Sequence, residues 1–208
     1  MDIRRRLFSV IAVRVVVGTL LLGFAVLIQV SQPGALPVNP FFFLIALTYA
    51  LSVAYLYMLR WVERSPWLAD LQFGIDAMLV SAFIAVTGGI TSYFSSLYVL
   101  PIIAASTIRF RRGALQVAIL SAALYLALVS LQYAGGVPLP WWGASDLPSQ
   151  RIAQYTVAIN LSGFIAVALL AGSLAEGLRS AGARLTDASH QIADLRAFND
   201  DVINSLLS

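Results

Sequence analysis

The chain has 208 residues, of which 60% are hydrophobic and 11% charged, and its mean hydropathy is +0.85. Soluble domains carry about 25% charged residues, so this composition excludes a soluble globular domain and indicates an integral membrane protein. The formal net charge is +3 and there is no cysteine, which excludes disulfides and thiolate metal sites. The excess positive charge is explained by loops that face anionic lipid, so nothing independent indicates a nucleic-acid partner.

Six stretches are apolar and approach the length needed to cross a bilayer core of about 30 Å, which takes about 20 helical residues. They are residues 7–30, 41–59, 68–87, 93–108, 114–133 and 152–175. The first is an apolar run with no small-residue cleavage site, so we interpret it as a retained span and not as a signal peptide. The sequence therefore predicts an all-α fold, with a transmembrane six-helix bundle over residues 1–175 and a cytoplasmic signalling helix or coiled coil over residues 176–208.

Basic residues gather in alternate gaps between these stretches, and all of them are arginine. One set of gaps holds Arg4, Arg5, Arg6, Arg60, Arg64, Arg109, Arg111, Arg112, Arg179 and Arg184. The opposite gaps hold only Arg151. Positively charged short loops stay in the cytoplasm during insertion, so both termini are expected there. The tryptophans agree with this topology, because Trp61 and Trp67 fall in an inner gap while Trp141 and Trp142 fall in an outer one.

Two charged residues fall deep inside predicted spans, Arg14 in the first and Asp76 in the third. Inserting a charged side chain at this depth of a bilayer costs on the order of 3 kcal/mol, so each of these residues is expected to have a structural or functional role. At about 1.5 Å per residue both lie roughly 10 Å below the cytoplasmic surface, which allows an ion pair. In the alternative, Arg14 extends to the head groups while Asp76 is protonated or bonds a hydroxyl. A pair could be a structural clamp or the movable part of a switch.

The third and fourth spans are joined only by residues 88–92, which makes them a tight antiparallel hairpin, and Pro101 is expected to bend the fourth span. Polar and aromatic groups lie near its tip and in the sixth span: Ser92, Tyr93, Phe94, Tyr98 and Asn160. Apolar walls with a few hydrogen-bonding groups would suit a membrane-dissolved ring compound such as a quinone. The alternative is that these polar residues only hold helices together.

Beyond residue 175 the chain becomes charged, while an apolar seam continues at alternating steps of four and three. The seam includes Leu178, Leu185, Ile192, Leu195, Asn199 and Val202. This heptad spacing predicts a parallel dimeric coiled coil that continues the sixth span, in which Asn199 would fix the register. The alternative is an amphipathic helix that lies on the membrane or packs on another domain.

Residues for catalysis are not apparent. His190 is the single histidine and is expected to face water, and one imidazole without cysteine cannot complete a transition-metal site. Nucleophile-elbow, phosphate-binding and zinc-protease motifs are missing from the sequence. The remaining classes are a sensor input domain, a small transporter or permease-like protein, and a membrane anchor.

The segments GGITSYF at residues 88–94 and ADLRAFNDDVINSLLS at 193–208, with six spans and short loops, resemble the amino-terminal half of PilS/NtrB-like sensor histidine kinases. The hairpin is also similar to the GGxxNPF segment that is tied to quinone sensing in redox-responsive six-span kinases. Gly88, Gly89 and Phe94 match that segment, whereas Ser92 and Tyr93 replace its Asn and Pro.

The resemblance implies an input module of the bacterial cytoplasmic membrane that forms a homodimer. It further implies that the tail leads into PAS and histidine-kinase domains, which act on a response regulator, and that a quinone is a candidate ligand. The histidine box and the ATP-binding glycine boxes of the family are missing, so this segment by itself is expected to phosphorylate nothing.

Overall fold

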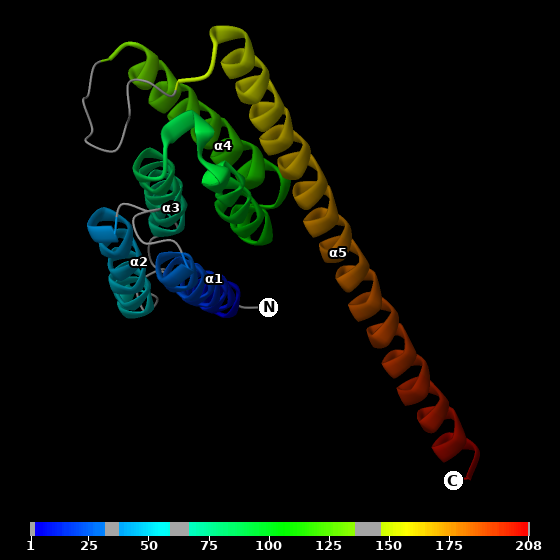
Figure 1. The fold of residues 1–208 in the computed structure, drawn as a ribbon. Coiled ribbons are helices and arrows are strands. Elements are labelled where there is room, and N and C mark those ends of the chain that lie inside the picture. Colours follow the sequence, from blue (N-terminus) through cyan, green and yellow to red (C-terminus); the bar gives the residue numbers. More distant parts are fainter. Residues whose placement is uncertain (1–2, 32–37, 59–66, 136–146, 208) are drawn as a thin grey trace.

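The computed structural model describes residues 3–31, 38–58, 67–135 and 147–207, and within these ranges it contains helices and no strand. The elements are α1 (Ile3–Ser31), α2 (Val38–Met58), α3 (Trp67–Val86), the 3-10 helices η1 (Gly89–Thr91) and η2 (Tyr93–Tyr98), α4 (Val99–Tyr133) and α5 (Gln150–Leu207). The all-α prediction is therefore confirmed for the described residues (Figure 1).

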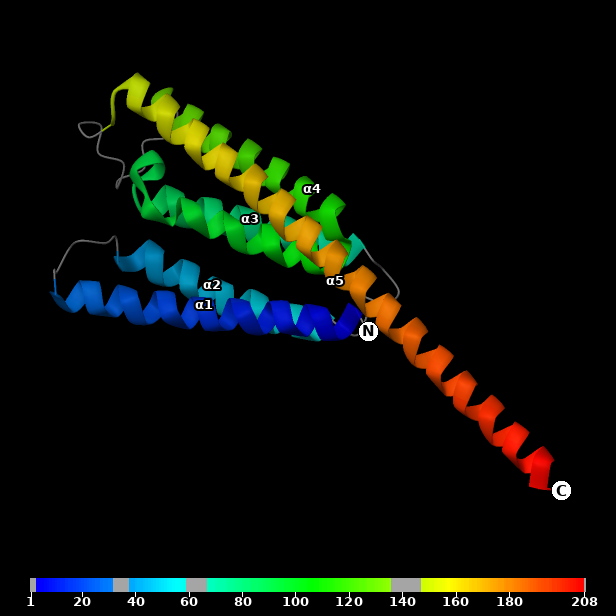
Figure 2. The ribbon, with the colours of Figure 1, turned by 90° about the vertical axis from the view of Figure 1, so that its right-hand side faces the viewer.

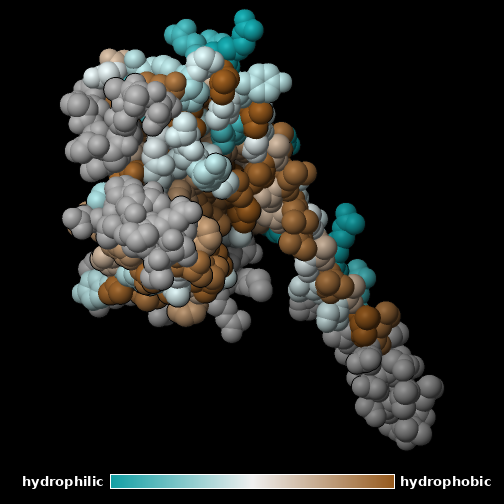
Figure 3. Space-filling model, in the orientation of Figure 1, coloured by the Kyte–Doolittle hydropathy of each residue, from teal (hydrophilic) through white to brown (hydrophobic). Residues whose placement is uncertain are grey.

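The helices run side by side, and α5 extends far beyond the others (Figures 1 and 2). The N-terminal end of α1, the turn within α4 and the protruding part of α5 share one end of the molecule, whereas η1 and η2 lie at the opposite end (Figure 2). Apolar residues cover much of the bundle and part of α5 (Figure 3). Such a surface is expected where lipid, and not water, surrounds the protein.

Helix α4 is two helices joined by a sharp turn. Phe110 has φ 55° and ψ −142°, which no α-helix accommodates, and the chain reverses there. Gly113 permits this turn, because a Cβ atom at that position would lie 2.5 Å from the Cβ of Arg109 and 3.0 Å from the backbone oxygen of Ala105. The two arms, residues 99–109 and 111–133, correspond to the predicted fourth and fifth spans.

Four helical stretches are long and apolar enough to cross a membrane, by length and composition. They are Pro40–Met58, Trp67–Val86, Tyr93–Tyr133 and Gln150–Ser189. The third has 41 residues and includes the turn at Phe110, and α1 contributes the shorter apolar segment Phe8–Phe24. The chain is thus a membrane protein with an all-helical fold.

The fourth predicted span differs from expectation in its first third, because Tyr93–Tyr98 forms a 3-10 helix and the α-helix begins only at Val99. Pro101 is the third residue of α4, in its first turn, where a missing N–H leaves no hydrogen bond unmade. Pro101 therefore marks the start of an α-helix and does not kink the middle of one.

Helix α5 runs without interruption for 58 residues, which at about 1.5 Å per residue gives a rod of about 87 Å. Gly177 and Gly182 do not interrupt it. In the most apolar part of α5 only 17% of residues are buried, against 44% for α3, because α5 packs chiefly against α4 along one side.

An aromatic cluster joins α2, the end of α3 and η2. The ring centroid of Phe41 in α2 lies 5.5 Å from that of Phe83 in α3 and 5.8 Å from that of Phe94 in η2.

Candidate functional site

The hairpin tip is built around two glycines and an amide from α4. Gly88 and Gly89 have φ values of +115° and +66°, which side-chain-bearing residues rarely adopt. The buried side chain of Gln132 closes the turn: its Oε1 accepts a hydrogen bond from the backbone N–H of Ile90 at 2.9 Å, and its Nε2 donates to the carbonyl of Gly88 at 3.3 Å. A Cβ atom on Gly89 would lie 2.2 Å from Oε1 of Gln132. Gly89 is therefore needed for Gln132 to fit, whereas Gly88 is needed for the backbone conformation of the turn.

Ser92 and Tyr93, which follow this turn, point in different directions. Ser92 is buried, its Oγ lies 2.5 Å from that of Thr87, and it accepts a hydrogen bond from the N–H of Phe94. Tyr93 is 95% exposed and so faces away from the protein. Of the residues predicted to bind a ligand at the tip, Ser92 therefore points into the protein and Tyr93 points away from it.

Tyr98 lies at the centre of an aromatic cluster that connects the hairpin with α5. Its ring is fully buried, and its centroid lies 6.3 Å from that of Tyr125 in α4 and 5.2 Å from that of Phe164 in α5. The rings meet edge to face, the geometry that aromatic pairs favour. The hydroxyl of Tyr98 lies 2.6 Å from Oγ of Ser81 in α3. Side chains of α3, η2, α4 and α5 therefore meet at one point.

Asn160 joins the same cluster from α5. Its Nδ2 donates to the carbonyl of Thr156 at 2.9 Å and lies 3.4 Å from the hydroxyl of Tyr125. The structure thus brings Asn160 to Tyr98 through Tyr125. The polar groups of Ser92, Tyr98 and Asn160 all have partners within the protein, an arrangement in which polar side chains hold helices together.

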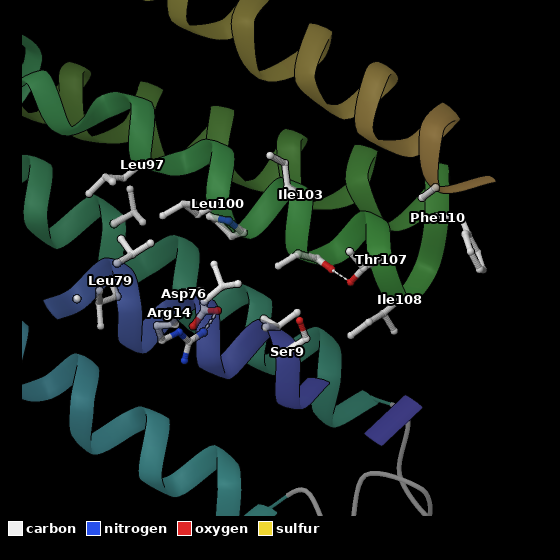
Figure 4. A pocket seen from close by; sticks show the side chains of 18 of the residues that line it. Ser9, Arg14, Asp76, Leu79, Leu97, Leu100, Ile103, Thr107, Ile108 and Phe110 are labelled. Atoms are coloured by element: carbon white, nitrogen blue, oxygen red, sulfur yellow. Dashed lines mark hydrogen bonds and ion pairs between the residues drawn. The ribbon is translucent and has the colours of Figure 1, made fainter. Parts of the chain in front are cut away.

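Arg14 of α1 and Asp76 of α3 form an ion pair, and their side chains are only 13% and 12% exposed (Figure 4). The guanidinium of Arg14 also stacks over the ring of Tyr55 in α2, with Cζ 4.6 Å from the ring centroid. Three helices are therefore joined at this level. In this arrangement Arg14 turns inward and does not extend to the head groups.

The turn of α4 contacts both α3 and α5. Arg109 pairs with Asp70 at the start of α3, 2.7 Å between Nη2 and Oδ2, and both side chains are about 40% exposed. The backbone of Arg111 packs so tightly on Gly172 of α5 that a Cβ there would lie 2.7 Å from the Cα of Arg111. The guanidinium of Arg179, two turns further along α5, stacks over Phe110 at 4.8 Å. Movement of this turn would therefore displace α5.

A cavity of about 1250 Å³ opens between α1, α3, the first arm of α4 and α5 (Figure 4). Its walls are mostly apolar, and its charged lining residues are Arg14, Asp76 and Arg179. The predicted ligand residues Gly88, Gly89, Ser92, Tyr93, Phe94, Tyr98 and Asn160 do not line it. The quinone site predicted at the hairpin is separate from this cavity and stays a prediction. Among the described residues no three His, Asp or Glu side chains gather as a metal site would need.

The predicted seam of the tail is exposed in the single chain. Leu178, Leu185, Ile192 and Leu195 are between 53% and 74% exposed. Asn199 and Val202 belong to α5, but their side chains lie outside the described part of the structure. Trp61, Trp141, Trp142, Arg60 and Arg64 also fall outside the described residues.

Among the residues of these sites that the sequence does not indicate are Gln132, Tyr125 and Phe164. Gln132 is an amide near the end of an apolar stretch, where its cost in lipid could have indicated a specific partner. Tyr125 and Phe164 are aromatic residues among many, and no pattern in the sequence distinguishes them from lipid-facing neighbours.

Comparison with known proteins gives one result. A family model described as a PilS-like transmembrane domain matches residues 1–185. Neither a curated protein nor a solved structure matches the chain. The match covers α1 to α4 and α5 as far as residue 185. It therefore includes the hairpin tip, the ion pair and the aromatic cluster. The chain belongs to the family of PilS-like transmembrane domains.

Proposed function

We propose that the chain is the membrane input module of a two-component sensor histidine kinase. It crosses the cytoplasmic membrane six times, has both termini in the cytoplasm, and passes a signal received in or at the membrane along α5. The recipients are PAS and kinase domains, and through them a response regulator. Membership of the PilS-like family supports the sensor assignment. Residues 1–175 would receive the signal and residues 176–208 would transmit it.

Helix lengths support six spans. The six residues of η2 rise about 2.0 Å each and residues 99–109 about 1.5 Å each, so together they extend about 28 Å, close to the bilayer core of about 30 Å. Because a 3-10 helix rises more per residue than an α-helix, residues 93–109 are long enough to cross the bilayer core. The second arm of α4 and the 29-residue α1 are long enough as α-helices.

The observation that carries the proposal is the continuity of α5. The same 58-residue helix supplies Phe164 and Asn160 to the aromatic cluster, Gly172 and Arg179 to the α4 turn, and then the exposed apolar seam. A rigid rod transmits rotation or displacement over its whole length. Changes at the hairpin can therefore reach the cytoplasm without a flexible joint.

The exposed seam supports a homodimer. Leucine and isoleucine side chains at heptad spacing, exposed in the monomer, would be buried in a two-stranded coiled coil. Ala181 and Ala188 between them would make the seam loosely packed, which would allow alternative rotations or offsets that differ by about a few kcal/mol. Such a pair of states is what a signalling helix requires.

Disulfide crosslinking in native membranes tests the dimer, because the chain has no cysteine of its own. Leu178→Cys, Leu185→Cys and Ile192→Cys should each form same-residue disulfides between two chains. Ser180→Cys and Asp187→Cys, on the opposite side of the same helix, are the matched controls and should form few. If the seam and control positions crosslink equally, the parallel dimer is wrong.

A small transporter is the second candidate, because the cavity contains a charged pair within the membrane. Transport requires that a solute cross the bilayer through that cavity. Proteoliposomes holding the full chain should show no solute flux if the chain is a sensor, while crosslinking along α5 should still occur. Flux that Asp76→Asn abolishes would instead support transport.

A further inference from the structure

We propose that the cavity between α1 and α5 is a binding site for one acidic phospholipid, taken from the leaflet at the arginine-rich end of the molecule. The acyl chains lie along the apolar walls and the phosphate lies at Arg179. This site is separate from the hairpin, and the proposal does not depend on a signalling role.

The length of the cavity fits a lipid tail. Along the end of η2 and the first arm of α4 its lining extends from Leu97 to Ile108, which at about 2.0 Å per residue in the 3-10 helix and about 1.5 Å per residue in the α-helix is about 17 Å. Half of a bilayer core of about 30 Å is about 15 Å. The volume of about 1250 Å³ exceeds the range of about 300–1,000 Å³ that is typical of sites for small soluble ligands. An occupant with long apolar chains fits both dimensions.

The charges of the lining select an anionic head group. Arg14 is paired with Asp76, so these two residues contribute no net charge. Arg179 is then the charged lining residue that adds a net positive charge, at the cavity end where Phe110 marks the α4 turn. A guanidinium that stacks on a ring by its face keeps its N–H donors directed outward from its edge, where they can bind phosphate oxygens.

The occupant would also hold α5 against the rest of the bundle. The α5 wall consists of Ala175, Leu178, Arg179, Gly182, Ala183 and Thr186, and its glycine and alanines leave room for a chain of methylenes. Gly182 lines the cavity and has no atom within 4 Å of where a Cβ would be, so a side chain introduced there has room to start toward the cavity. Gly163, also on α5, is equally free of neighbours but does not line the cavity. These two glycines provide a matched pair of positions.

The test uses the full chain in phosphatidylcholine nanodiscs that contain a small fraction of a probe lipid with a photoreactive group in the middle of one acyl chain. The probe is phosphatidylglycerol in one arm and phosphatidylcholine in the other. After illumination, the labelled residues are identified by mass spectrometry. We expect the phosphatidylglycerol probe to label the cavity lining, for example Val13, Val17 and Leu100, about fivefold more than the phosphatidylcholine probe, as one arginine contact implies.

Four variants make the test specific. Arg179→Gln should remove the preference for phosphatidylglycerol, whereas Arg184→Gln, which replaces an arginine outside the cavity, should keep it. Gly182→Trp should abolish labelling of the lining by either probe, whereas Gly163→Trp should not. Equal labelling by the two probes, or labelling that persists in Gly182→Trp, would overturn the proposal. So would crosslinks that join Val13 or Leu100 to α5 of a second copy with lipid excluded, whereas a disulfide between two copies of position 178, at the α5 wall, is expected for the dimer.

Discussion

Gly89 is the residue on which the hairpin tip depends most, since its positive φ and the amide of Gln132 both exclude a side chain. Gly89→Ala should lower the free energy of unfolding by about 3 kcal/mol, through backbone strain of about 1–2 kcal/mol and a buried N–H left without a partner, about 1–3 kcal/mol. Gly135→Ala is the control, because Gly135 has the same φ of +66° and nothing within 4 Å. It should cost only the strain. Unfolding of the purified chain in SDS measures both, and equal costs would contradict the role of Gln132.

The ion pair between Arg14 and Asp76 gives a second prediction. Arg14→Ala and Asp76→Ala should each cost about 3 kcal/mol or more, because each leaves a charge buried without its partner. The swapped pair Arg14→Asp with Asp76→Arg should recover part of this. Asp70→Ala, which breaks the half-exposed pair with Arg109, should cost less than about 1 kcal/mol. SDS unfolding checks all four, and absence of any rescue in the swap would count against pairing.

Some contacts of single residues could be predicted from the sequence and others could not. Equal depth of Arg14 and Asp76 follows from counting residues in two spans, so their proximity could be anticipated. The hydrogen bond between Gln132 and Ile90 joins residues 42 apart in the chain, and no local pattern encodes it. Phe110 with its positive φ is equally unpredictable, because aromatic residues disfavour that conformation and only the surrounding packing imposes it.

Among the elements, the contact between the α4 turn and α5 yields the clearest prediction. Gly172→Ala should destabilise the protein by about 1–3 kcal/mol, since the new Cβ would meet backbone atoms of Arg111 that cannot turn away. Gly163→Ala, on the same helix with open space around it, should instead be neutral or stabilising by up to about 1 kcal/mol. Thermal unfolding in detergent compares the two. A Gly172→Ala variant as stable as Gly163→Ala would mean that the turn does not press on α5.

Helices α2 and α3 begin and end within a few residues of the stretches predicted at 41–59 and 68–87, because each stretch is long and largely apolar. The predicted fourth span, residues 93–108, agrees least well with the observed helix bounds. Its 3-10 segment arises from the short connection after Gly89 and from packing of Tyr98, which hydropathy does not record. The lateral order of helices, and with it the cavity, also could not be predicted, since apolar faces toward lipid and toward protein look alike in sequence.

At the scale of the molecule, arginine-rich segments and the protruding part of α5 share one end (Figure 2). The proposed topology places this end in the cytoplasm. In spheroplasts, Tyr93→Cys at the hairpin end should react with a membrane-impermeant maleimide from outside. Asp187→Cys should react only after the membrane is permeabilised. Labelling of Asp187→Cys in intact spheroplasts would mean that the orientation is reversed.

Transmission from the bundle to the cytoplasm requires that α5 remain one rod where it leaves the membrane. Spin labels at Leu174→Cys and Ile192→Cys in one chain, diluted with unlabelled chain, measure this directly. For a continuous rod we expect a single narrow distance distribution centred near 27 Å, the length of 18 helical residues at about 1.5 Å each. A broad distribution, or one shifted to shorter distances by a bend at Gly177 or Gly182, would contradict it.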